Sequence, residues 1–173
     1  MDFSLPQAYL IGLLVLLGGA AVVVGRQILR VRRDETALAR LEASTREGDQ
    51  SAAALYELGS VQLRKRLYSQ AADTLKQAAK RAGDEPAEAQ ALIENALGFA
   101  LAAQSNYAGA VRHYRAALRA KADYPVALNN LAFALEKQQK PEEAQATYEQ
   151  VLQLDSGNRT AQKRLKRLKQ LAA

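Results

Sequence analysis

The chain has 173 residues and a formal net charge of +6, and this length suits one modest domain with an appendage. It contains no cysteine, which excludes thiol catalysis, disulfides and thiolate metal sites, and its abundant Ala, Leu, Gln, Glu, Lys and Arg favour an all-α protein. Its positive charge is concentrated in residues 26–33 and 159–169, which suggests local electrostatic roles and argues against a general nucleic-acid-binding surface.

The first predicted element is an uncharged apolar helix. Residues 5–25 contain no charged side chain, and a helix of about 21 residues is about 31 Å long, enough to cross the core of a bilayer. We therefore predict a transmembrane helix over 5–29, preceded by a short translocated N-terminus, residues 1–4. A cleaved signal peptide is the alternative, but it would carry basic residues before the apolar run, where this chain has only Asp2.

Arginines follow the apolar run and predict its orientation. They are Arg26, Arg30, Arg32 and Arg33. By the positive-inside rule this end stays in the cytoplasm or the stroma, and the N-terminus would face the lumen of a photosynthetic membrane. The same arginines could hold anionic headgroups at roughly 1 kcal/mol each, but we favour the topological role.

Residues 30–50 form a predicted juxtamembrane connector. Its polar helix has a thin apolar stripe at Ala37, Leu38 and Leu41, and it could continue the membrane helix. Gly48 and Asp49 indicate where the helix stops, and Ser51 can cap the next one. We expect the connector to space the following domain from the bilayer.

A repeat of 34 residues organises the middle of the chain. Matched pairs 34 residues apart are Gly98 and Ala132, Ala110 and Ala144, and Tyr114 and Tyr148. A small residue, an alanine and an aromatic recurring in phase at this period are typical of the tetratricopeptide repeat (TPR). Two short antiparallel helices meet closely only where a small residue faces a large one. We predict three repeats over 51–158, namely 52–85, 86–124 and 125–158.

The first and second repeats are separated by an insertion. Gly59 and Gly98 are 39 residues apart, five more than the period. We expect Gly83 to end a helix in the left-handed conformation, Asp84 to cap the next helix and Pro86 to lie in its first turn. The first helix of the second repeat should then be longer than usual. The insertion could bind a partner, but a tolerated extension is the simpler interpretation.

A basic helix is predicted over 159–173. Ala161, Leu165 and Leu168 share its apolar face. Its other faces carry only cations among their charged residues: Arg159, Lys163, Arg164, Lys166, Arg167 and Lys169. We expect a solvating cap on an open-ended stack, and the alternative is a basic patch for anionic lipid or an acidic partner. The predicted fold is thus all-α: one transmembrane helix, an α-solenoid of three helix pairs and a capping helix.

The residues that catalysis and metal binding require are scarce. His113 is the only histidine, and no second histidine or group of carboxylates converges with it in the pattern of a metal site. No serine or threonine stands in a nucleophile-elbow or phosphate-loop context. We therefore predict a non-enzymatic protein without a cofactor, a metal or a small-molecule substrate.

The TPR resemblance implies a groove built from the first helix of each repeat. Projected onto this chain, the groove consists of Tyr56, Ser60, Arg64, Asn95, Phe99, Asn129, Phe133, Lys137, Lys163 and Arg167. Its asparagines could hold the backbone of an extended peptide, and its phenylalanines could grip an apolar side chain or lie partly buried between helices. A clamp for chaperone tails is not expected, because Tyr56 and Ser60 replace its lysine and asparagine.

The whole layout resembles one family, the photosystem I assembly protein of cyanobacteria and chloroplasts, a plastid open-reading-frame family. The matching segments are 55–59, 95–99 and 127–132, and the resemblance extends over nearly the full length. It implies a single-pass thylakoid protein that helps to build or stabilise photosystem I, with photosystem I subunits or assembly intermediates as partners.

Three functions therefore stay open at this point. The main hypothesis is a membrane-tethered scaffold for assembly of photosystem I. The second is a bacterial envelope adaptor for cytochrome maturation or pilus assembly, which requires the opposite topology. The third is a lipid-surface adaptor that works through 159–169 and whose membrane binding depends on salt.

Overall fold

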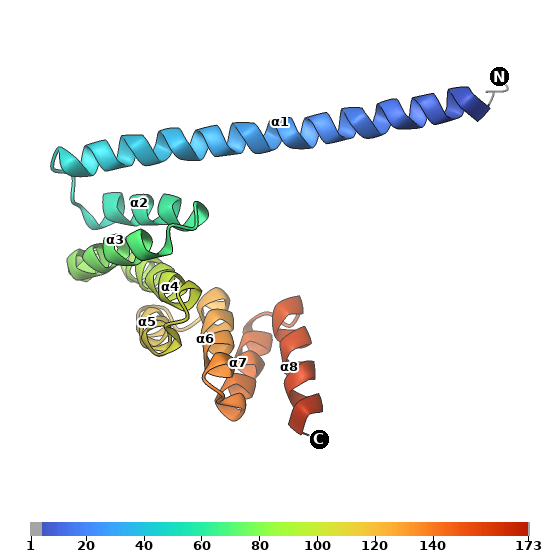
Figure 1. Cartoon of the computed structure of the whole chain (residues 1–173). Coiled ribbons are helices and arrows are strands. Elements are labelled where there is room, and N and C mark those ends of the chain that lie inside the picture. Colours follow the sequence, from blue (N-terminus) through green and yellow to red (C-terminus); the bar gives the residue numbers. More distant parts are fainter. Residues whose placement is uncertain (1–4, 173) are drawn as a thin grey trace. The chain divides into compact units, whose positions relative to one another are not determined.

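The computed structural model describes the backbone of residues 5–172 and the side chains of residues 9–170. The described chain is all-α, with no strand, as predicted (Figure 1). Its elements are α1 (Leu5–Arg46), α2 (Ala52–Arg64), α3 (Tyr68–Arg81), the 3-10 helix η1 (Ala82–Asp84), α4 (Ala87–Ala103), α5 (Tyr107–Ala120), α6 (Pro125–Lys137), α7 (Pro141–Leu154) and α8 (Arg159–Ala172). The chain divides into two compact units, one extending to Arg40 and the other beginning at Leu41.

Helix α1 is one uninterrupted helix of 42 residues. It contains the predicted membrane segment and most of the predicted connector, so the two do not form separate helices. Its apolar part has a mean hydropathy of 2.0 and none of it is buried in the protein. The helix is therefore long and apolar enough to cross a membrane, a property that a signal sequence near an N-terminus shares.

The predicted boundary after α1 is confirmed. The helix ends at Arg46, and Gly48 has a φ of 118°, a conformation that side chains disfavour. The backbone amide of Ala54 then donates to Ser51 Oγ at 3.2 Å. This bond satisfies one of the free amides in the first turn of α2.

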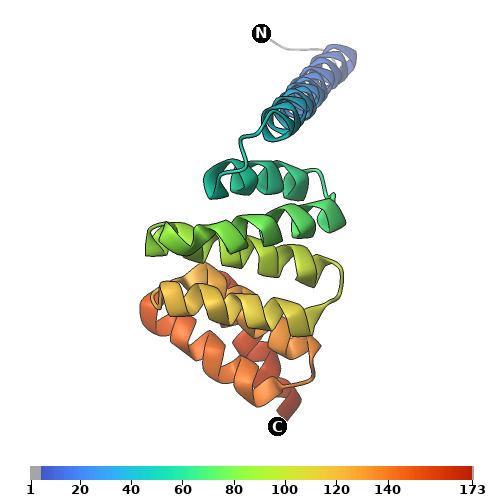
Figure 2. The same ribbon diagram turned by 90° about the vertical axis from the view of Figure 1, so that its left-hand side faces the viewer.

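The second unit is a stack of helix pairs. Helices α2 and α3, α4 and α5, and α6 and α7 form the three pairs, and each helix packs on the next in the chain (Figure 2). Helix α8 packs on α7 and ends the stack. Contacts between chain neighbours are what a solenoid of short repeats requires.

The repeating residues form the core at the positions that the period predicts. Leu75, Tyr114 and Tyr148 are at most 2% exposed, and each faces a small residue of its partner helix. A Cβ atom added to Gly98 would lie 2.6 Å from Tyr114 Cε1, and one added to Gly59 would lie 2.6 Å from Leu75 Cγ. Close packing of the two helices therefore depends on the missing side chains.

A left-handed residue closes the turn inside every repeat. Arg66, Ser105 and Gln139 have φ values of 60°, 63° and 59°. In each repeat the next residue donates its backbone amide to a carbonyl five positions earlier, for example Asn106 N to Leu101 O at 2.9 Å. This is the Schellman arrangement, formed here without glycine. The sequence contains no glycine that would have predicted it.

The insertion lengthens α4, as predicted, but its caps differ from the prediction. Helix α4 has 17 residues, against 13 in α2 and in α6. Gly83 is not left-handed, and Asp84 does not cap α4. Pro86 is instead the residue before the helix, with an extended ψ of 149°. Its ring restricts φ, and Gln90 Nε2 takes over the capping role by donating to Glu85 O at 2.8 Å.

Candidate functional site

Exposed apolar side chains gather on the first helices of the second and third repeats. Among the described residues of the second unit, the exposed large hydrophobics are Leu92, Phe99, Val126 and Leu154, at 42%, 45%, 54% and 50%. The first three belong to α4 and α6, the helices predicted to line the groove. A cluster of exposed apolar side chains on a soluble surface is typical of a protein-binding site.

An amide network joins α4 to α6 beside these residues. Asn95 Oδ1 accepts from Asn130 Nδ2 at 3.0 Å, and Asn95 Nδ2 donates to the hydroxyl of Tyr124 at 3.4 Å. Burial raises the pKa of Tyr124, and the neighbouring Tyr56 acts in the same direction. Both polar atoms of Asn95 are therefore already engaged within the protein.

Asn129 has a comparable structural contact at the other side of α6. Its Nδ2 donates to Asn158 Oδ1 at 3.2 Å, and the same oxygen accepts from the backbone amide of Ala161 at 3.1 Å. Asn158 thereby caps α8 while Asn129 holds the cap in place. Asn129 Oδ1 is buried and has no partner within the described part of the chain.

A nearly buried carboxylate joins α6, α7 and α8. The side chain of Glu136 is 6% exposed. It accepts from the hydroxyl of Tyr148 at 2.7 Å, from Arg167 at 2.7 Å and from Arg164 at 3.5 Å. Two arginines and a phenol thus compensate a charge that would otherwise be costly to bury.

Cations also surround Phe133. The Lys137 ammonium lies 5.5 Å from the centre of its ring, and the Arg164 guanidinium lies 5.0 Å from it. Both distances suit a cation–π interaction. Phe133 is half-buried, whereas Phe99 is exposed, so the two predicted aromatic contacts differ in accessibility.

Helix α8 borders a cationic hollow of about 680 Å³. The residues that line it are Arg159, Thr160, Lys163, Arg164, Lys166, Arg167 and Gln170. Because Arg164 and Arg167 reach Glu136 on α6, the hollow lies on the side of α8 that faces α6. Lys169 lies outside the lining and pairs with Glu149 at 3.1 Å.

The predicted groove residues fall into three groups. Asn95 and Phe99 share α4, and Asn129, Phe133 and Lys137 share α6 with Lys163 and Arg167 nearby on α8. Tyr56, Ser60 and Arg64 lie on α2, where Arg64 Nη1 donates to the carbonyl of Ser60 at 3.4 Å. The sequence analysis missed Leu92 and Val126, although both occupy the second position of their repeats, and it missed Arg164 and Asn158.

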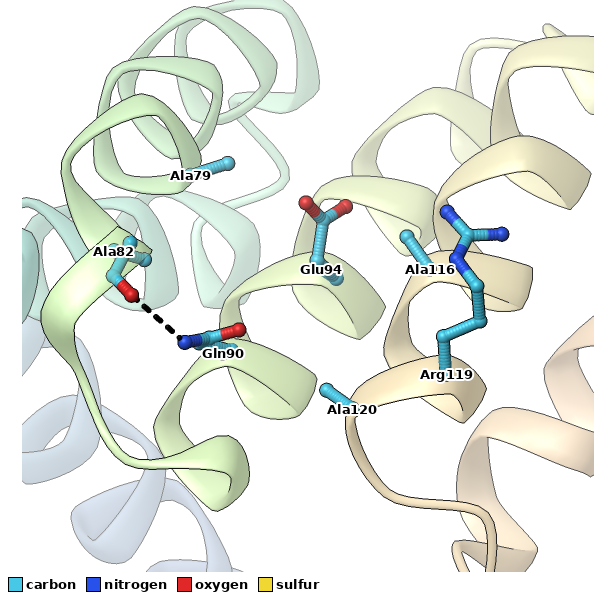
Figure 3. Close-up of a pocket in the computed structure, with 8 residues that line it drawn as sticks. Ala79, Ala82, Gln90, Glu94, Ala116, Arg119 and Ala120 are labelled. Carbon is cyan, nitrogen blue, oxygen red and sulfur yellow. Dashed lines mark hydrogen bonds between the residues drawn. The ribbon is translucent and has the colours of Figure 1, made fainter.

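A second hollow, of about 340 Å³, lies among α3, η1, α4 and α5 (Figure 3). Its walls include Ala79, Ala116 and Ala120, and Glu94 and Arg119 are the charged residues that line it. Glu94 Oε2 lies 2.7 Å from Nδ1 of His113. Within the described residues no three metal-ligating side chains gather, here or elsewhere.

Both ends of the second unit match models of one repeat. Residues 29–86 and residues 101–169 each match a family described as tetratricopeptide repeat. A solved structure, the first TPR of Spaghetti (RPAP3) bound to an HSP90 peptide, is 25% identical, covers 70% of this chain and 94% of its own, and superposes with a TM-score of 0.65. Fold and repeat together define a TPR scaffold, a class that binds peptides and proteins.

Relatives in photosynthetic organisms extend over almost the whole chain. The ycf37 protein of Guillardia theta is 30% identical over 95% of this chain and 93% of its own length. The chain belongs to the ycf37 family of TPR proteins. The chloroplastic TPR protein PYG7 of Arabidopsis thaliana is 34% identical over 97% of this chain, which spans only 56% of that protein.

Proposed function

We propose that this protein is a membrane-tethered scaffold that binds subunits or assembly intermediates of photosystem I at the thylakoid membrane. Membership of the ycf37 family and the similarity to a chloroplastic TPR protein support this assignment. The observation that carries it is the exposed apolar surface of Leu92, Phe99 and Val126 on the first helices. The proposal assigns the protein no catalytic step.

The tether is the apolar part of α1. A domain held at the membrane meets membrane-bound partners at a higher effective concentration than a free domain does. We assign the membrane segment to 5–29, the connector to 30–50, the repeats to 51–158 and the basic cap to 159–173. The exposed Arg26, Arg30, Arg32 and Arg33 support an orientation with the repeats in the cytoplasm or stroma.

An affinity purification tests the partner. The tagged full-length protein is isolated from its own membranes in mild detergent, and bound proteins are identified by mass spectrometry. We expect enrichment of photosystem I subunits and its loss in the double variant Leu92→Ser, Phe99→Ser. Both side chains are exposed, so the substitutions leave the core intact. Leu154→Ser, at an equally exposed site on α7, is the matched control and should retain the partners.

Asn129 is less suitable for this test. Its amide holds the cap of α8, so removal of Asn129 would disturb the fold as well as the surface. Recovery of cytochrome or pilus assembly proteins without photosystem I subunits would contradict the proposal and favour an envelope adaptor.

A protease test on sealed vesicles separates these two functions by topology. With the proposed orientation, protease added on the cytoplasmic or stromal side digests the repeats and leaves a short protected fragment. Complete protection of the repeats on that side would place them across the membrane, as an envelope adaptor requires.

A further inference from the structure

We propose that the cationic hollow beside α8 binds an extended acidic segment of a protein partner. The inference rests on the proposed function only in that the partner is a protein. It identifies the chemistry of the bound segment, namely several carboxylates next to one apolar side chain.

The first argument is the number of cations left without an acid. The hollow is lined by five cations, of which Arg164 and Arg167 are held by Glu136. Arg159, Lys163 and Lys166 have no ion pair with any described residue. Helix α8 contains no aspartate or glutamate, so its own residues do not offset this charge. The hollow therefore has a free capacity for anions.

The second argument is the position of Arg159. It lies in the first turn of α8, where the helix dipole disfavours a positive charge. The preceding helix follows the usual preference, with Glu142 and Glu143 in the first turn of α7. A local preference that is broken without compensation inside the protein is a sign of function. An anionic ligand would supply the missing compensation.

The third argument concerns the shape and the neighbours of the hollow. Its volume of about 680 Å³ lies within the usual range of about 300–1,000 Å³ for ligand sites. Arg164 joins the lining to the ring of Phe133, and Lys137 lies at the same ring. Carboxylates in the hollow would therefore place an adjacent apolar side chain near Phe133.

These features favour a peptide over a bilayer surface. The apolar residues of α8 within 159–170 are Ala161, Leu165 and Leu168, and all three are buried against the stack. The described part of α8 thus has no apolar side chain to insert among lipids, as an interfacial helix does. A recess with an aromatic edge suits a side chain better than a flat layer of headgroups.

Fluorescence anisotropy with a labelled peptide tests the inference. The full-length protein is placed in nanodiscs of neutral phosphatidylcholine, and the probe is the peptide Glu-Glu-Glu-Leu-Glu-Glu-Glu, with its all-glutamine counterpart as a blank. The triple variant Arg159→Gln, Lys163→Gln, Lys166→Gln should weaken binding roughly tenfold or more, equivalent to ~1.4 kcal/mol. Binding to the unaltered protein should also weaken as salt is added.

A second triple variant removes the same charge elsewhere. Lys76→Gln, Lys80→Gln, Arg119→Gln takes three exposed cations from α3 and α5 and should leave the affinity unchanged. Equal losses in both triple variants would overturn the inference, because net charge and not the hollow would then attract the probe.

Two further outcomes keep the site and the function apart. Nanodiscs that contain phosphatidylglycerol should not displace the peptide. If they displace it from the unaltered protein but not from the α8 variant, the hollow is a lipid site and the inference fails. If the probe does not bind while the tagged protein still captures photosystem I subunits, the inference fails and the proposed function stands. If the probe binds without such capture, the proposed function fails and the site stands.

Discussion

At the scale of single residues, the turn inside each repeat holds a side chain in a conformation that suits glycine. Arg66, Ser105 and Gln139 all have left-handed backbones, which cost about 1–2 kcal/mol for residues other than glycine. The Schellman hydrogen bonds that follow each of them offset this cost. The three repeats therefore share a small strain that substitution can relieve.

We predict that Ser105→Gly stabilises the protein by about 0.5–1 kcal/mol, because relief of the left-handed strain exceeds the extra entropy that glycine loses on folding. Urea unfolding followed by circular dichroism measures the change. Ser69→Gly, an exposed serine within α3, is the control and should destabilise by about 0.5 kcal/mol. A loss of stability in both variants would show that the turn is not strained.

Buried phenols predict instability in alkali. Burial raises the pKa of Tyr114 and of Tyr148 above the usual value of about 10, and the hydrogen bond to Glu136 adds to the effect at Tyr148. Above about pH 10 the unfolded chain loses these protons while the folded chain keeps them, so the free energy of unfolding should fall with rising pH. Below that pH the two phenols contribute no pH dependence.

Urea titrations across this range measure the slope. Tyr148→Phe should flatten it, although it also removes the bond to Glu136 at a cost of about 1 kcal/mol. An unchanged slope in this variant would contradict the role of Tyr148 in the alkaline transition.

At the scale of elements, α8 is attached through side chains as well as through its apolar face. Glu136 receives two of its arginines, and Asn129 holds the residue that caps it. In a stack where each helix contacts its neighbours, loss of such a link should loosen one end only. The attachment also positions the lining of the cationic hollow.

We expect Glu136→Gln to destabilise this end by about 1–3 kcal/mol, since hydrogen bonds to a charged group are replaced by weaker neutral ones. Hydrogen exchange should show faster exchange in α8, with α2 and α3 unchanged. Glu149→Gln, at an exposed pair with Lys169, should leave exchange nearly unaltered. Uniformly faster exchange in all helices would show that the stack unfolds as one unit.

At the scale of the whole molecule, the chain consists of two units with different solvents. The helix up to Arg40 is apolar and unburied, whereas the unit that begins at Leu41 has its own core. We predict that residues 41–173 produced alone are soluble and helical and unfold cooperatively, because the apolar contacts of the repeats all lie within this unit. Aggregation or loss of helicity would show that the first helix supports the fold.

The fold was largely predictable because its pattern is local. The spacing of Gly98, Tyr114, Ala132 and Tyr148 predicted which side chains face each other, and all four are buried as expected. The caps of the insertion were predicted wrongly at Asp84, because a proline next to a helix start can replace a polar cap and a distant glutamine can satisfy the freed groups.

The candidate site was less predictable than the fold. Sequence reasoning identified Phe99 on α4 and the cations of α8, since each follows from a position in the repeat. It could not show that Asn95 and Asn129 are engaged by other asparagines, or that Glu136 neutralises two arginines, because those partners lie 28 to 35 residues away. Periodicity encodes which residues face a neighbouring helix, so the helices, their pairing and the apolar first helix could be read from the chain. The cations and amides that stay free for a partner depend on contacts between distant residues, and these exist only once the helices are stacked.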